Sequence, residues 1–193
     1  MKLVLLIFFI SIALFGQNAN TKLILEGKVI SKINNEPVQG CNVFIKNTQM
    51  GTMADSLGNF IFYNLNKNGQ YIISVSASGY PMKDTSIYLA EGTPKTITIF
   101  LNTDCIYDST KAVEDLKNGK AKLLIAGGIA PMANSKEDLE FEAKYKVQYY
   151  DFGCTPPAYE CISQYNKIIF EYLNNKYQNE WLRFVRKDVI GLK

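Results

Sequence analysis

A change of hydrophobic period near residue 104 constrains the fold of this chain more than any other feature of its sequence. From residue 23 to residue 101 apolar and polar residues alternate, as in the segment KTITIFL at residues 95–101. After residue 104 apolar residues recur at steps of three and four, as in Ile162, Tyr165, Ile169 and Leu173. A period of two is typical of half-buried strands, and steps of three and four are typical of amphipathic helices. The sequence therefore predicts a β-rich half followed by a half that contains helices.

The first half is predicted to be an all-β sandwich, because short alternating segments are separated by regular turns and no helical period occurs. The glycines Gly58 and Gly79 suit turns that need a positive φ angle. Asp55 and Asn59 are interpreted as turn residues in preference to a calcium loop. The seven predicted strands cover residues 23–31, 40–46, 51–54, 60–65, 71–77, 84–89 and 95–101.

The second half is predicted to be a small α/β domain, because short apolar segments alternate with helical ones. The predicted helices cover residues 109–118, 135–144, 158–177 and 180–187, and the predicted strands cover residues 121–126 and 147–151. The order strand, helix, strand favours a right-handed parallel unit. The predicted fold class is therefore α+β overall, with a seven-stranded sandwich at residues 22–102 and an α/β domain at residues 105–193.

Four segments of the first half carry a family resemblance: EGKV at residues 26–29, EPVQGCNV at 36–43, TMADSLGNF at 52–60 and ISVSASGY at 73–80. In order and spacing they resemble the carboxypeptidase regulatory-like domain, a prealbumin-like β-sandwich. The chain departs from that pattern at Cys41, where the family usually has alanine. The resemblance implies an accessory module of exported proteins that has no catalytic residues of its own.

Three segments of the second half carry a narrower resemblance: FEAKY at residues 141–145, FGC at 152–154 and YNK at 165–167. They are similar to the FEKKY domain, a small exported module that often follows a regulatory-like β domain, although Ala143 departs from its pattern. That family implies no activity for this chain.

The N-terminus has the pattern of a secretory signal peptide. Lys2 precedes about thirteen mostly apolar residues, and Gly16 then precedes a polar segment. A membrane-spanning helix would need roughly 20 apolar residues. We predict a signal peptide at residues 1–16, with cleavage after Ala19 as the alternative. The mature protein is then periplasmic, outer-membrane-associated or secreted.

Export places the four cysteines in an oxidising compartment, where disulfides persist. We predict a disulfide between Cys154 and Cys161, because the short loop between them contains two prolines and favours closure. Cys41 is predicted to be a buried thiol on the inward face of its strand. The pairing of Cys105 stays open, since the sequence does not decide it.

The absence of histidine from the sequence excludes Ser-His-Asp and Cys-His catalytic sites. We predict a protein that is not an enzyme and has neither a cofactor nor a metal site. Its net charge of +3 gives no electrostatic basis for binding nucleic acid. A binding crevice is expected where the carboxyl ends of parallel strands meet. It would be formed by Gly127, Gly128, Asp151, Phe152 and Gly153, unless the glycines serve only to turn the backbone.

The function predicted from these observations is that of an exported, non-enzymatic binding or accessory protein of the bacterial envelope. Its partner would be an envelope protein, a peptide or a carbohydrate polymer, and its mature chain would have no transmembrane segment. Two alternatives stay open. One is a hydrolase-type or thiol enzyme in the α/β half, using Cys154 or the carboxylates. The other is a structural or inhibitor-like partner of an envelope complex.

Overall fold

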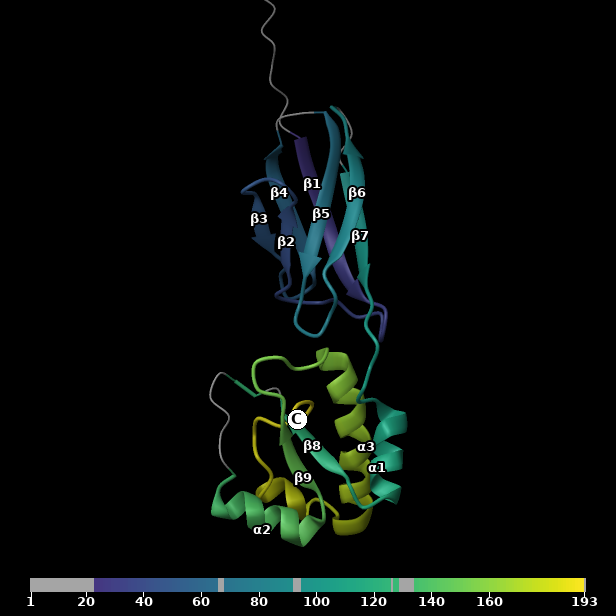
Figure 1. The fold of residues 1–193 in the computed structure, drawn as a ribbon, viewed down its shortest axis with the longest axis vertical. Helices are drawn as coiled ribbons and strands as arrows, with labels where there is room; N and C mark the ends of the chain where they lie inside the picture. The colour runs from purple at the N-terminus through teal and green to yellow at the C-terminus, as the bar shows by residue number, and fades with distance from the viewer. Residues whose placement is uncertain (1–22, 66–67, 92–94, 126, 129–133, 193) are drawn as a thin grey trace, which may run out of the picture.

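The computed structural model of the protein describes residues 23–65, 68–91, 95–125, 127–128 and 134–192. The predicted signal peptide lies outside these residues. Within them the fold is mixed α+β, with nine strands and three α-helices. Figure 1 shows that strands β1 to β7 occupy one end of the molecule, and that the helices with β8 and β9 occupy the other. We refer to residues 23–101 as the sandwich and to residues 105–192 as the α/β half.

The sandwich consists of two sheets, with strand orders β4-β1-β7 and β3-β2-β5-β6. β7 pairs with β1 in parallel, and the other strand pairs of the sandwich are antiparallel. The predicted strands are confirmed to within two residues at each end. Their bounds are Leu23–Ser31 (β1), Asn42–Ile45 (β2), Gly51–Met53 (β3), Asn59–Leu65 (β4), Gly69–Ser76 (β5), Lys83–Leu89 (β6) and Lys95–Leu101 (β7).

The core of the sandwich follows directly from the alternation in the sequence. In β1 every second residue is buried, including Leu25 and Val29. These side chains belong to one hydrophobic cluster with Val43, Val75 and Ile99 from the neighbouring strands. Burying each large apolar side chain contributes roughly 1.5–3 kcal/mol. The inward face of each strand therefore holds the two sheets together.

The turns of the sandwich have the conformations that the sequence predicts. Gly58 and Gly79 have φ angles of 75° and 77°. The Asp55 carboxylate accepts hydrogen bonds from the backbone N–H groups of Leu57 and Asn59, both at 2.8 Å. These bonds satisfy the backbone of the turn, so the interpretation of Asp55 and Asn59 as turn residues is confirmed.

The α/β half is built around two parallel strands, β8 and β9, as predicted. Helix α2 begins with a capping box, in which the side chains of Ser135 and Asp138 each accept a hydrogen bond from the other's backbone N–H group. Figure 1 shows α1 and α3 side by side along the sheet and α2 at its other flank. The bounds are Ser109–Lys117 (α1), Lys122–Ile125 (β8), Lys136–Tyr145 (α2), Gln148–Asp151 (β9) and Tyr159–Tyr177 (α3). No helix among the described residues is long and apolar enough to cross a membrane.

The prediction of a helix at residues 180–187 is wrong for residues 184–187. The structure has a single 3-10 turn, Glu180–Arg183. Beyond it, Val189 forms an antiparallel bridge with Ile125, and the N–H group of Ile190 donates to the carbonyl oxygen of Leu124 at 3.2 Å. Backbone bonds to β8 thus replace the helical ones, and they extend the edge of the small sheet.

Asn166 in α3 fixes this C-terminal segment to β8. Its side chain is fully buried, accepts a bond from the N–H of Leu124 at 2.9 Å and donates to the carbonyl oxygens of Leu124 and Ile190 at 2.9 and 2.8 Å. A buried amide that forms three bonds satisfies backbone groups that water cannot reach. Asn166 therefore joins three elements that are distant in sequence.

Asn166→Leu should lower the free energy of unfolding by about 2–5 kcal/mol, because it leaves the Leu124 N–H and the Ile190 carbonyl without these partners. Urea unfolding of the purified variant measures the change. Asn175→Leu, at an exposed position of the same helix, is the control and should change stability by no more than about 0.5 kcal/mol. Equal stability of the two variants would contradict this role of Asn166.

Candidate functional site

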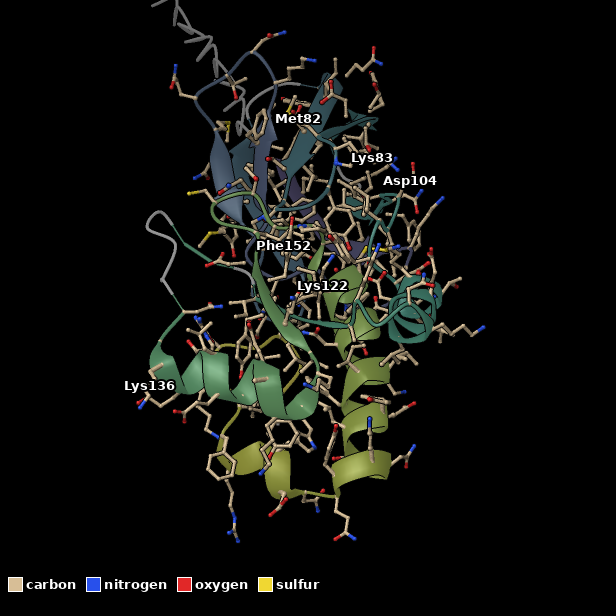
Figure 2. The ribbon with its side chains drawn as sticks, turned by 60° about the horizontal axis from the view of Figure 1, so that its bottom comes forward. Met82, Lys83, Asp104, Lys122, Lys136 and Phe152 are labelled. Atoms are coloured by element: carbon tan, nitrogen blue, oxygen red, sulfur yellow. A yellow bond between two sulfur atoms is a disulfide. The ribbon has the colours of Figure 1, made fainter. Side chains whose placement is uncertain are left out.

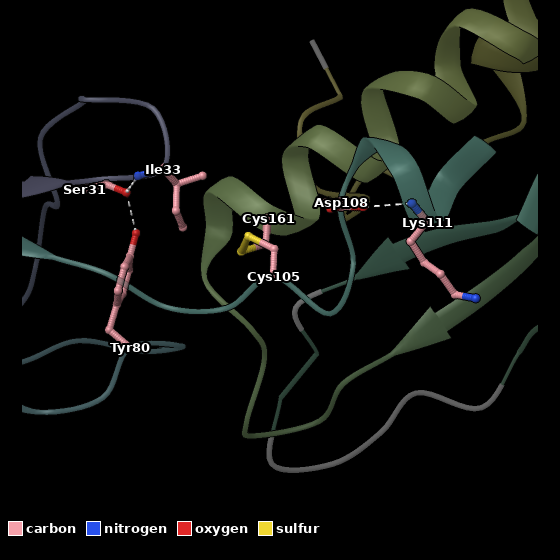
Figure 3. The surroundings of a disulfide bond; sticks show 7 residues. All are labelled: Ser31, Ile33, Tyr80, Cys105, Asp108, Lys111 and Cys161. Carbon is pink, nitrogen blue, oxygen red and sulfur yellow. Dashed lines mark hydrogen bonds between the residues drawn. A yellow bond between two sulfur atoms is a disulfide. The ribbon is translucent and has the colours of Figure 1, made fainter. Parts of the chain in front are cut away.

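The disulfide of this protein joins Cys105 and Cys161, so the predicted Cys154–Cys161 bridge is wrong. Cys105 lies in the segment between β7 and α1, and Cys161 lies in the first turn of α3 (Figure 3). Cys41 is a free thiol that is 1% exposed, as predicted, and burial raises its pKa. The bridge thus connects the segment that leaves the sandwich to the start of the longest helix.

The prolines explain why the shorter loop does not close. Pro156 and Pro157 restrict the backbone and favour an extended conformation for the residue before each of them. The free thiol of Cys154 remains exposed on the far side of these prolines, where it donates to the carbonyl oxygen of Gly128 at 3.5 Å. Cys161 is fully buried and faces Cys105.

The start of α3 is in direct contact with the sandwich through Gly79. A Cβ atom on Gly79 would overlap the backbone nitrogen of Ala158 and the carbonyl carbon of Pro157. Gly79 lies in the turn between β5 and β6 and has a positive φ angle. The two backbones therefore approach as closely as they do because residue 79 has no side chain.

Tyr80 extends this contact on the sandwich side. Its hydroxyl donates to the Oγ of Ser31 at 2.8 Å, and the same Oγ accepts a bond from the N–H of Ile33 at 3.2 Å (Figure 3). Burial raises the pKa of Tyr80; the bond to Ser31 opposes this rise, and the neighbouring carboxylate of Glu160 adds to it. The phenol of Tyr80 and the carboxylate of Glu160 are therefore neighbours across the junction.

A cavity of about 540 Å³ opens at this junction between the sandwich and the α/β half. Three loops of the sandwich form one wall, and the start of α3 together with Ile190 forms the other. Its lining residues are Glu36, Pro37, Val38, Gln39, Gly40, Ser56, Ala77, Ser78, Tyr80, Pro156, Pro157, Tyr159, Glu160, Ile162 and Ile190. Cavities of 300–1,000 Å³ between structural units are typical small-ligand sites.

Glu160 is the most unusual residue in this cavity. It is 9% exposed, and its Oε2 atom is buried without a hydrogen-bond partner among the described residues. Within the same residues no lysine or arginine forms an ion pair with it. Burying a carboxylate is costly unless a cation or hydrogen-bond donors compensate for its lost hydration. Glu160 is therefore a group that the described protein atoms leave incompletely satisfied.

The structure brings most of the predicted crevice together at the carboxyl ends of β8 and β9. Asp151 is paired with Ile125, and its Oδ1 atom accepts a bond from the N–H of Gly153 at 2.7 Å. A Cβ atom on Gly127 would overlap this same Oδ1 atom, whereas one on Gly128 would meet nothing. The contacts of Asp151 and Gly127 are those of a packed turn, and a ligand-binding role for these residues stays a prediction.

Phe152 belongs to an aromatic cluster. It lies just beyond the end of β9 (Figure 2), and its ring meets those of Tyr107 and Tyr150 with centroid distances of 5.3 and 5.0 Å. The ammonium group of Lys122 lies 5.4 and 5.0 Å from the centroids of Tyr107 and Tyr150, within the range of cation–π attraction. These contacts connect β8, β9 and the segment before α1.

Other residues of the second resemblance have structural contacts. Glu142 accepts a bond from the N–H of Tyr149 at 2.8 Å, which joins α2 to β9. The hydroxyl of Tyr165 donates to Asp115 of α1 at 2.8 Å. Burial alone would raise the pKa of Asp115, but this bond and the ion pair with Lys111 together hold that pKa below its usual value. The assignment to the FEKKY domain stays a prediction.

The described residues contain no cluster of three or more carboxylates or thiols arranged to hold a metal ion. The cavity itself was missed at the sequence level, because it depends on how two separately folded segments meet. Two features of the sequence point to this cavity. One is Gly79, which is predicted only as a turn residue, and the other is a glutamate flanked by Ala158, Cys161 and Ile162 at the apolar start of a helix.

Residues 25–109 match the family model of the CarboxypepD_reg-like domain. This region covers the sandwich strands and extends through the segment that carries Cys105. The resemblance inferred for the first half is confirmed at the level of this domain. No curated protein matches the sequence.

Several solved structures are similar to part of the chain. BcpA, the major pilin subunit of Bacillus cereus, is 17% identical, with a TM-score of 0.39 over 44% of this chain and 31% of that chain. The pilus 2b backbone protein of group B streptococcus is 15% identical, with a TM-score of 0.37 over 42% of this chain and 41% of that chain. Catechol 1,2-dioxygenase from Pseudomonas arvilla C-1 is 12% identical, with a TM-score of 0.34 over 46% of this chain and 54% of that chain. The similarity therefore spans about a third of the pilin subunit and about half of the dioxygenase.

Proposed function

We propose that this protein is an exported, non-catalytic binding protein of the bacterial envelope, and that its ligand site is the cavity between the sandwich and the α/β half. In this proposal residues 1–16 direct export, and residues 22–102 and 105–193 are two domains. The observation that carries it is the cavity of about 540 Å³ with the incompletely satisfied Glu160 in its wall. The match of residues 25–109 to a regulatory-like domain supports a binding role.

The Cys105–Cys161 disulfide supports the location outside the cytoplasm. Disulfides persist in the periplasm and outside the cell, whereas cytosolic thiols are kept reduced. This bridge holds the start of α3, and with it Pro157 and Glu160, near the loops of the sandwich. Oxidation after export would thus complete the wall of the proposed site.

The contacts of Cys154 do not favour a thiol enzyme. Its sulfur atom contacts the carbonyl oxygen of Gly128, which cannot take up a proton from it at neutral pH. A nucleophilic cysteine needs a base or a positive environment to form the thiolate. The chain has no histidine to act as that base.

Gln39→Trp should abolish capture of the envelope ligand, because an indole at this exposed position of the lining fills the cavity. The measurement is affinity capture from an envelope extract with the mature protein, followed by identification of what is retained. Gln70→Trp is the matched control, since Gln70 is an exposed glutamine on β5 outside the cavity lining. Equal capture by wild type and Gln39→Trp would contradict the proposed site.

A further inference from the structure

We propose that the cavity binds a primary ammonium group carried on an aliphatic chain, as in a lysine side chain, and that Glu160 is its counter-ion. This inference rests on the proposed function and adds the chemical class of the ligand. Its basis is the charge, the burial and the wall chemistry of the cavity.

The charge of the lining is the first observation. Among the described residues that line the cavity are two glutamates, Glu36 and Glu160, and no lysine or arginine. The whole chain has more basic than acidic residues, with a net charge of +3. The cavity therefore has the opposite sign to the protein, and it attracts cations.

The two glutamates differ in their exposure and in their hydrogen-bond partners. Glu36 is exposed, and its carboxylate accepts a bond from the side-chain amide of Asn34 at 2.9 Å. Glu160 is nine-tenths buried, and its Oε2 atom has no partner among the described residues. It also lies in the first turn of α3, where the helix dipole favours a negative charge. A cation that enters the cavity therefore finds its counter-charge at Glu160.

The walls fit a cation with an apolar stem. Pro37, Pro156 and Pro157 offer apolar surface, and the ring of Tyr159 at the rim is 60% exposed. An aliphatic chain gains from contact with such surfaces, and an aromatic ring attracts an ammonium group. A guanidinium binds best when two carboxylate oxygens face it in one plane, whereas an ammonium is a point charge. Because an ammonium needs contact with only one carboxylate oxygen, whereas a guanidinium needs both in one plane, the primary ammonium is the better fit to the nine-tenths buried Glu160.

The test is a titration of the isotope-labelled mature protein, followed by NMR, with two compounds that differ only in the terminal ammonium group. The first is N-acetyl-lysine N-methylamide, and the second is N-acetyl-norleucine N-methylamide, which lacks the ammonium group. A ligand with about 14 non-hydrogen atoms at about 0.3 kcal/mol per atom has a dissociation constant of about 1 mM. We expect this value for the lysine compound and binding weaker by about tenfold or more for the norleucine compound.

Glu160→Gln should reduce binding of the lysine compound to the level of the norleucine compound, with the melting temperature changed by only a few degrees. The matched control is Glu171→Gln, an exposed glutamate on the same helix, which should bind as the wild type does. If Glu160→Gln fails to fold, the affinities of the wild type for the two compounds still show whether the cavity uses the charge of its ligand.

Three results would overturn the inference. Equal affinity of the wild type for both compounds would show a cavity that binds without using the charge, and the proposed function would then stand while this inference fails. Undiminished binding of the lysine compound by Glu160→Gln would place its site elsewhere. Failure of both compounds to bind would also reject the proposed ligand class. The proposed function is tested separately, by comparing ligand capture from envelope extract by the wild type and by Gln39→Trp.

Discussion

Replacing both Cys105 and Cys161 by alanine should lower the free energy of unfolding by about 4 kcal/mol. The bridge spans 56 residues of sequence, and closing a loop of that length removes entropy from the unfolded chain. The effect should be larger than that of most single substitutions, which cost about 0.5–3 kcal/mol. Urea unfolding of the oxidised wild type and of the double variant, at equal protein concentration, measures the difference.

Cys154→Ala is the control for this experiment, because Cys154 is an exposed free thiol. Its stability should stay within about 0.5 kcal/mol of the wild type. Reduction of the wild type should reproduce the loss seen in the double variant. If Cys154→Ala is the destabilised protein and the double variant is not, the assigned pairing is wrong.

Gly79→Ala should lower the free energy of unfolding by about 2–5 kcal/mol and weaken ligand capture at the same time. The added methyl group overlaps the backbone of Pro157 and Ala158, and backbone atoms cannot move aside as a flexible side chain can. Overpacking of this kind costs about 1–3 kcal/mol. The positive φ angle of residue 79 adds about 1–2 kcal/mol for any residue with a Cβ atom.

Gly119→Ala separates these two contributions. Gly119 has a similar φ angle of 67°, but a Cβ atom there would meet nothing within 4 Å. It should therefore lose about 1–2 kcal/mol from the backbone conformation alone and retain full ligand capture. Equal losses of stability in the two variants, with capture intact in both, would show that the contact between Gly79 and α3 does not shape the site.

The sandwich was predictable from the sequence because its determinants are local. Alternation in segments such as residues 95–101 decides which face of a strand is buried, and turn residues such as Asp55 decide where strands end. The match of residues 25–109 to a regulatory-like domain agrees with this interpretation. Errors at the strand ends amount to one or two residues, and they include the buried residues Cys41 and Ala54, whose apolar side chains continue the alternation beyond the paired backbone.

The disulfide and the cavity were not predictable, because both depend on contacts between distant segments. Sequence proximity favoured Cys154 over Cys105, but Pro156 and Pro157 separate Cys154 from the helix that carries Cys161. Similarly, the helix predicted at residues 180–187 ends at Arg183, and Val189 then bridges to Ile125 in β8.

The burial of Glu160 was not predictable for the same reason, because it depends on contacts between distant segments. On the sequence Glu160 is one of the 18 acidic residues, and its apolar neighbours alone do not show that it will be buried. Its burial arises because Gly79 allows the sandwich to approach the start of α3, and because the disulfide holds that helix in place. Burial of this kind becomes visible only when the two halves are seen together.

A crystal structure of the mature protein with N-acetyl-lysine N-methylamide is the most direct test of the proposed site. The ligand should occupy the cavity between the sandwich and the α/β half, with its ammonium nitrogen about 3 Å from a carboxylate oxygen of Glu160. A ligand bound outside this cavity, or a cavity filled by protein side chains with Glu160 paired to a protein cation, would contradict the account.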